Sequence, residues 1–293
     1  MQVGLTSFLK RTPSARTALA GPIALRRWWL RYRAVPAQAM LGNLESMVVS
    51  DIEVRVAEFE GVFRLGPRSH LLQRVLAEGV YEPMLAKLFV QHLRPDRDVI
   101  DVGANIGFFS VLAGKKLGKG RVLAAEPTRA AFARLSHNVA ANGVTDKVIL
   151  FNGLVTDSDA EQPLNIVPGR EEYASLGQVV HASVVDQPTE VQWTPSRTLD
   201  SLVAEHGLSP ALIKVDVEGA ELAVLEGAEE TLKRHRPVVL SEFSSHLLAA
   251  NGASVDRLLA LFERWNYDVR DPHDPLVKPG SIKSEEIIAV PRS

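Results

Sequence analysis

An acidic residue and two glycines lie at the end of an apolar run in VIDVGANIGFFS, residues 99–110. Asp101 falls inside the run, while Gly103 and Gly107 frame the turn that follows it. Glycine lets the backbone take positive φ and lets a ligand approach closely, so such a turn after a strand is suited to binding a nucleotide. The dinucleotide fingerprint G-x-G-x-x-G does not fit, because Asn105 stands where its second glycine is required.

The pattern instead favours S-adenosylmethionine as the bound nucleotide. No Gly-Lys-Ser or Gly-Lys-Thr follows the glycines, so a phosphate-binding P-loop is excluded. A carboxylate beside the turn disfavours a pyrophosphate, whereas S-adenosylmethionine carries an ammonium and a sulfonium group and no phosphate. Glu126 ends the next apolar run, 25 residues after Asp101, and we expect it to accept hydrogen bonds from both ribose hydroxyls. The structural alternative is that Asp101 binds the turn amides and Glu126 caps the following helix.

A second set of acidic residues follows two later apolar runs, where it can act on a methyl acceptor. In IKVDVEGAE, residues 213–221, alternation places Lys214, Asp216 and Glu218 on one side of a strand. Glu242 ends the next run. An alcohol is a poor nucleophile until its proton leaves, so Asp216 is the first candidate for a general base and Glu242 the second. Alternatively, these two carboxylates hold Mg²⁺, which prefers such oxygens; the sequence leaves the metal undecided.

Other interpretations of these acids remain open. Glu218 is also placed to complement a helix N-terminus, and Lys214 to neutralise Asp216. His181 and His246 are further candidate bases, although a single histidine is more often structural. The strand end lacks the Asn- or Asp-Pro-Pro-Tyr/Phe motif of many amino-group and nucleic-acid methyltransferases, which favours an oxygen acceptor.

Alternating strands and helices must position these residues. The predicted strands span residues 98–103, 121–126, 147–154, 211–217, 236–243, 266–270 and 284–290. Helices are expected between most of them, including 128–142 and 219–234. This order predicts a mostly parallel sheet covered by helices on both faces. A hairpin (52–56 with 61–65) and a helical region (71–93) precede the sheet, and 160–197 is an insertion or lid with strand-like patches at 179–185 and 190–193.

The composition is that of a globular protein of 293 residues with a net charge of −2, which argues against nucleic-acid binding. It contains no cysteine, which fits a reducing cytoplasm. Residues 1–44 form a predicted basic helical arm with seven Lys and Arg and no acid; its short apolar run does not fit a secretory signal. We expect this arm to pack on the domain or on a second copy in a homodimer. The alternative is peripheral contact with the inner membrane face or an acidic partner.

Four motifs together resemble the FkbM family of S-adenosylmethionine-dependent methyltransferases: YEP (81–83), IDVGANIG (100–107), EP (126–127) and IKVDVEGAE (213–221). The resemblance covers residues 80–290 and implies a class I Rossmann-like fold, with a seven-stranded sheet whose last strand is antiparallel. The predicted division is then the arm (1–44), the hairpin and helices (45–95), and the methyltransferase domain (96–293).

The resemblance also implies an activity and a set of site residues. It implies O-methylation of a hydroxyl on a sugar or secondary metabolite, such as a glycan, glycolipid or polyketide-type acceptor. An N-methyltransferase on a small amine and a cofactor-binding scaffold without turnover are the alternatives. Asp101, Gly103, Asn105 and Gly107 are expected around the methionine end. The full set of expected cofactor-binding residues is Glu82, Asp101, Gly103, Asn105, Gly107, Phe108, Glu126 and Asn152.

Overall fold

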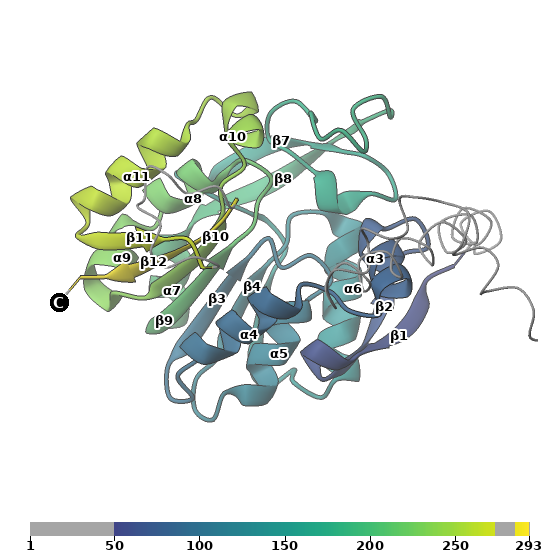
Figure 1. Ribbon diagram of the computed structural model, residues 1–293, viewed down its shortest axis with the longest axis horizontal. Helices are drawn as coiled ribbons and strands as arrows, with labels where there is room; N and C mark the ends of the chain where they lie inside the picture. The colour runs from purple at the N-terminus through teal and green to yellow at the C-terminus, as the bar shows by residue number, and fades with distance from the viewer. Residues whose placement is uncertain (1–49, 273–284, 293) are drawn as a thin grey trace, which may run out of the picture. The chain divides into compact units, whose positions relative to one another are not determined.

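Seven strands pair into one sheet in the computed structural model, which describes residues 50–272 and 285–292. Their order is β11-β12-β10-β9-β3-β4-β5 (Figure 1). The strands are β3 (Asp98–Val102), β4 (Val122–Ala125), β5 (Val148–Phe151), β9 (Pro210–Val215), β10 (Val238–Glu242), β11 (Tyr267–Arg270) and β12 (Glu286–Pro291). β12 runs opposite to the other six strands, as predicted for the last strand.

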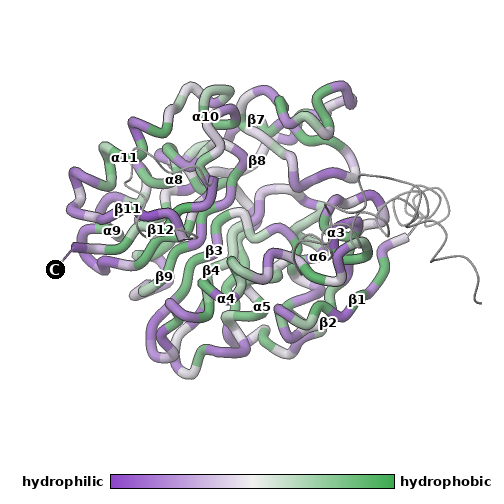
Figure 2. The backbone as a smooth tube through the Cα atoms, in the orientation of Figure 1, coloured by the Kyte–Doolittle hydropathy of each residue, from purple (hydrophilic) through white to green (hydrophobic). Residues whose placement is uncertain are grey.

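Helices cover both faces of this sheet. One face carries α3 (His70–Glu78), α4 (Pro83–His92), α5 (Phe108–Lys116) and α6 (Arg129–Ala141). The other carries α7 (Leu199–His206), α8 (Glu221–Glu226), α9 (Glu229–His235), α10 (Ser245–Ala250) and α11 (Val255–Arg264). Every residue of β4 and β9 is buried, and Figure 2 draws both strands mainly in the hydrophobic colour. This burial on both sides is what a parallel sheet between helical layers requires.

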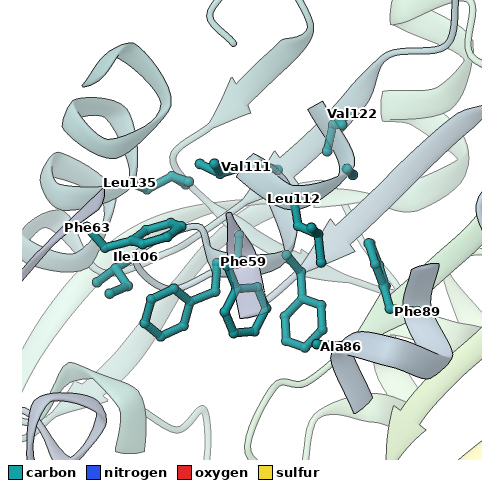
Figure 3. Packing of buried hydrophobic residues seen from close by; sticks show 14 of the residues in the cluster. Phe59, Phe63, Ala86, Phe89, Ile106, Val111, Leu112, Val122 and Leu135 are labelled. Carbon is teal, nitrogen blue, oxygen red and sulfur yellow. The ribbon is translucent and has the colours of Figure 1, made fainter. Parts of the chain in front are cut away.

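The predicted hairpin forms from β1 (Ile52–Val56) and β2 (Gly61–Leu65) and packs against the start of α5. Phe59, in the single 3₁₀ turn between the strands (Ala57–Phe59), stacks on Phe108 with ring centroids 4.7 Å apart. Phe63 meets the same ring edge-on, so three aromatic rings fill this part of the core, and Figure 3 labels Phe59 and Phe63 among them. The hairpin therefore supports the first helical residue after the glycine turn.

A second sheet is built from the predicted insertion, in the order β6-β8-β7. It consists of β6 (Leu154–Thr156), β7 (Ala160–Ile166) and β8 (Glu190–Thr198), with a short 3₁₀ helix, η3 (Glu171–Tyr173), in the connection. The strand expected at 190–193 is therefore confirmed. The strand-like patch at 179–185 is not a strand, because the amides of Val184 and Val185 bond locally to the carbonyl of His181 in a turn.

Two other predicted elements are divided in the structure. The strand expected over 147–154 ends at Phe151 and resumes as β6 in the second sheet. A Cβ atom on Gly153 would lie 2.4 Å from the Phe151 ring, so the chain bends closely there. The helix expected over 219–234 is two helices, α8 and α9, because Gly227 lies against the backbone of Thr156, whose carbonyl oxygen would be 2.0 Å from a Cβ.

The predicted basic arm, residues 1–44, lies outside the described residues, so its predicted contacts and the predicted homodimer stay predictions. Within residues 50–272 and 285–292, none of the helices has both the length and the apolar character needed to cross a membrane.

Candidate active site

The glycine turn after β3 uses left-handed backbone at three alternate positions. Gly103 has φ 75°, Asn105 has φ 49° and Gly107 has φ 91°, and Gly107 is the N-cap of α5. Asparagine tolerates this conformation better than most residues, so Asn105 takes the place of a glycine without changing the shape of the turn. The amides of Gly103 and Ala104 both donate to the carbonyl of Ala125, which ties the turn to the end of β4.

Gly103 also lies directly against the end of β9. A Cβ atom at this position would be 1.8 Å from the carbonyl oxygen of Asp216, a distance that no side chain could occupy. The amide of Asp216 donates in turn to the carbonyl of Val102. The turn predicted to bind the donor and the strand predicted to act on the acceptor are therefore joined through their backbones.

Glu126 is buried at the end of β4, with 5% of its surface exposed. Its Oε2 accepts from the amide of Asn105 at 2.9 Å, and its Oε1 accepts from the amide and hydroxyl of Thr128, the N-cap of α6. Burial raises the pKa of Glu126 to about 7, although these hydrogen bonds oppose the shift. The helix-capping interpretation is thus present in the structure, and a carboxylate with about four acceptor sites retains capacity for a ribose hydroxyl.

Asp101 lies behind the turn, with 1% of its surface exposed. Its Oδ2 accepts from the hydroxyl of Ser110 at 2.6 Å, and in the described part of the chain its Oδ1 has no hydrogen-bond partner. Burial raises the pKa of Asp101, while the charge of Lys214 and the Ser110 bond oppose this shift. Asp101 therefore bonds to α5 rather than to the turn amides, and its predicted contact with the methionine end stays a prediction.

One cavity of about 270 Å³ opens over the carboxyl ends of β3, β4, β9 and β10. Seven of the ten predicted site residues line it: Glu82, Gly103, Asn105, Phe108, Glu126, Asp216 and Glu242. Asp101, Gly107 and Asn152 do not. Gly107 faces Leu135, and the side-chain amide of Asn152 donates to the backbone carbonyl of Glu126 at 2.8 Å. The structure thus brings donor-side and acceptor-side candidates to one cavity, as expected where parallel strands end.

A buried cation sits beside Asp216. Lys214 is 4% exposed, and its Nζ donates to Oδ2 of Asp216 at 2.9 Å. The same Nζ lies 4.8 Å from the ring centroid of Phe109. Although burial opposes it, the charges of Asp216 and Asp101 raise the pKa of Lys214, so this ammonium stays protonated. The neutralising role that the sequence left open for Lys214 is the one the structure shows.

The remaining acids at this end of the cavity carry raised pKa values. Burial, followed by the charge of Asp216, raises the pKa of Glu242 to about 8 and that of Glu218 to about 9. Glu82, the N-cap of α4, has left-handed backbone with φ 43° and accepts from Arg74 at 3.2 Å. Its pKa is also raised, first by burial and then by Asp216. Perturbed carboxyls in a cleft are typical of functional sites.

Several residues that line the cavity were not among the candidates. His70 and Arg74 come from α3, and Glu172 and Tyr173 come from η3 in the insertion. The Tyr173 ring stacks on His181 with centroids 4.3 Å apart, and His181 lines the cavity whereas His246 does not. These positions carry no motif, and the only sequence signal was the prediction that the insertion lies beside the active face.

The donor set of the cavity fits a cationic nucleoside better than a phosphate. Of the described side chains that line it, Arg74 and Lys214 are cations, and each is paired with a carboxylate, Glu82 or Asp216. A pyrophosphate would find no unpaired cation here, whereas a sulfonium or ammonium group would face several carboxyls. Among the residues that the structure describes, no three His, Cys, Asp or Glu side chains are grouped so as to hold a metal ion. The described side chains therefore do not form a Mg²⁺ site.

The sheet order, the reversed last strand and the turn between β3 and α5 define a class I methyltransferase fold. The family model for the methyltransferase FkbM domain matches residues 101–269, more than half of the chain. The chain belongs to the FkbM family of S-adenosylmethionine-dependent methyltransferases.

Three curated proteins illustrate the relationship. The chain is 27% identical over 218 residues to the AMB antimetabolite synthetase AmbE of Pseudomonas aeruginosa; the match covers 64% of this chain but 10% of that protein. It is 28% identical to the 2-O-methyltransferase NoeI of Sinorhizobium fredii, covering 60% of this chain and 76% of NoeI. It is 29% identical to the 31-O-demethyl-FK506 methyltransferase FkbM of Streptomyces tacrolimicus, covering 63% and 77%.

Proposed function

We propose that this methyltransferase acts on oxygen, transferring the methyl group of S-adenosylmethionine to a hydroxyl of a sugar or a secondary metabolite. The observation that carries the proposal is the position of Glu242 and Asp216, which line the same cavity as the glycine turn. A hydroxyl needs a base to remove its proton, and these carboxyls supply one at the acceptor side. The names of two relatives, a 2-O-methyltransferase and a 31-O-demethyl-FK506 methyltransferase, support the same acceptor atom.

The two carboxyls differ in what they can do. Asp216 is bonded to the Lys214 ammonium, and this charge-assisted hydrogen bond fixes the orientation of its carboxylate as a hydrogen-bond acceptor. Glu242 has a pKa raised to about 8, close to neutral pH, where a general base works best. We assign proton removal to Glu242 and orientation of the acceptor hydroxyl to Asp216.

The donor side is assigned to the turn and to Glu126. When bound, S-adenosylmethionine supplies an electrophilic methyl group activated by its sulfonium charge. Glu126 holds the ribose, the turn from Gly103 to Gly107 admits the methionine end, and the carboxyl of Glu242 at the end of β10 faces the positive charge. The protein thus aligns the donor carbon with the acceptor oxygen, which is the main requirement of an in-line displacement.

The atom that receives the methyl group tests this proposal. The protein is incubated with donor carrying a ¹³C-methyl group and with a panel of glycosides, polyketide alcohols and amines. The ¹³C chemical shift of each product then separates O-methyl from N-methyl. O-methyl products that are lost in Glu242→Gln support the proposal. Methylation confined to nitrogen overturns it in favour of the amine alternative, and donor binding without any transfer favours a scaffold.

A further inference from the structure

Glu218, three residues after β9, was not a predicted catalytic residue, and among the described residues its carboxyl forms no capping hydrogen bond. The turn before α8 is bonded by Glu221, whose Oε1 accepts from the amides of Gly219 and Val217 at 3.2 and 3.4 Å. Glu218 lines the cavity, and in the described part of the chain its carboxyl forms no hydrogen bond or ion pair. Its backbone has φ 51°, a left-handed conformation that costs a glutamate about 1 kcal/mol.

The carboxyls that surround Glu218 come from several elements. Asp216 precedes it on the same segment, Glu221 follows it on α8, Glu242 lies on β10, and Glu172 lies on η3. All four act on Glu218 as negative charges and raise its pKa, after burial as the main cause.

Glu242 has similar surroundings. Asp216, Glu285 and Glu82 raise its pKa after burial, and only Lys214 opposes them. In the described residues, Glu242 has no ion-pair partner, because Lys214 is bonded to Asp216. Two neighbouring acids that lack a counter-ion must either hold protons or receive a positive charge from a ligand.

We propose that Glu218 and Glu242 form a catalytic pair whose protonation follows the charge of the methyl donor. With the sulfonium donor bound, the pair has lost one proton, and its negative charge balances the sulfonium. After transfer, the product is a neutral thioether, and the pair has regained one proton. The driving force is electrostatic, because a positive charge nearby stabilises a carboxylate and its removal stabilises the acid. The burial and raised pKa values of both groups make their protonation sensitive to such a charge.

The pair also provides a carboxylate that receives the proton of the acceptor hydroxyl. This part of the inference rests on the proposed function. The electron pair of the acceptor oxygen forms the new O–C bond, and the C–S bond breaks with its electron pair left on sulfur. The O–H bond breaks, and its proton passes to the carboxylate of Glu242 or Glu218. One positive charge leaves the sulfur and one proton joins the pair, so the net charge of the site is unchanged.

Calorimetry of donor binding tests the proposal without any acceptor. S-adenosylmethionine and S-adenosylhomocysteine are titrated separately into the full protein near neutral pH, in buffers with different ionisation enthalpies. The dependence of the measured enthalpy on the buffer gives the number of protons released. We expect the cationic donor to release about one proton more than the neutral product. The ratio of the two affinities should then rise about tenfold per pH unit in favour of the donor.

Variants test whether the extra protons released on donor binding come from Glu218 and Glu242. Glu218→Gln and Glu242→Gln should each reduce the extra proton release, and the double variant should abolish it. Glu161→Gln, an exposed residue of β7, is the matched control and should leave it unchanged. Equal proton release by both ligands overturns the proposal, as does an unchanged release in Glu218→Gln. If a variant fails to fold, the comparison of the two ligands on the unmodified protein still decides. Since no acceptor is present, a failure of the hydroxyl proposal does not affect this result.

Discussion

Replacing Lys214 by methionine removes the cation from between two aspartates and keeps the length and apolar part of the side chain. Lys214 Nζ is 2.9 Å from Oδ2 of Asp216, and its charge also acts on Asp101, which is 1% exposed. Removing one partner of a buried ion pair destabilises a protein by about 3–5 kcal/mol. The Asp216 side chain is 37% exposed, so water compensates part of the loss. We therefore expect a decrease of about 3 kcal/mol in the free energy of unfolding.

The effect should depend on pH in a defined direction. In the intact protein, burial already raises the pKa of Asp101, and the charge of Lys214 opposes that shift. Without Lys214 the folded-state pKa of Asp101 rises further above its unfolded value, so the folded state binds the proton more tightly. Stability then falls as pH rises from the unfolded pKa through the folded one. The deficit of Lys214→Met should be smaller at mildly acidic pH and larger at alkaline pH.

Urea unfolding followed by circular dichroism measures this deficit. Lys233→Met is the matched control, since Lys233 is half-exposed and its surface ion pair with Glu229 is worth at most about 1 kcal/mol. Adding Asp101→Asn to Lys214→Met should recover part of the loss, because the uncompensated buried charge is then absent. A loss below about 1 kcal/mol for Lys214→Met, or a loss that does not vary with pH, would refute the reasoning.

Three further predictions concern the donor side and Asp216. Gly103→Ala should lower the free energy of unfolding by more than about 2 kcal/mol, because the position combines φ 75° with a clash against the carbonyl of Asp216. Gly143→Ala is the control and should lower it by about 1 kcal/mol, because Gly143 has φ 69° but open space around it. Comparable losses in urea unfolding would remove the clash from the explanation. Glu126→Gln should weaken S-adenosylmethionine binding about tenfold in calorimetry, through loss of a charge-assisted hydrogen bond; an unchanged affinity would exclude Glu126 from the ribose site. Asp216→Asn should reduce turnover about 100-fold with nearly unchanged donor affinity, and a near-normal rate would argue against its role.

Much of the sheet could be predicted because its signals are local. The apolar runs ending at Val102, Ala125 and Val215 mark buried strands, and the glycines after the first of them mark the turn. The carboxyl ends of parallel strands meet at one edge, so the positions of Glu126, Asp216 and Glu242 in the chain already placed them near one another. These were the parts for which periodicity and motif agreed.

The rest depends on contacts between segments far apart in the sequence. Nothing near Gly227 shows that Thr156 passes against it, so the division of α8 from α9 was not predictable. Glu172 from the insertion and Glu218 after β9 line the same cavity, and no local pattern encodes this. Alternation placed Lys214 and Asp216 on one side of a strand, but it did not show that Lys214 is buried. Burial lowers its pKa, and the charges of Asp216 and Asp101 raise it, so that the lysine keeps its proton.

The contact between Gly103 and the carbonyl of Asp216 sets a fixed spacing by main-chain atoms alone. Because main-chain atoms close this gap, no side chain separates the turn from the end of β9. Under the proposed function, the donor turn and the acceptor strand are therefore held at one distance, and a difference in acceptor size has to be accommodated in the cavity walls that α3 and the insertion around η3 provide.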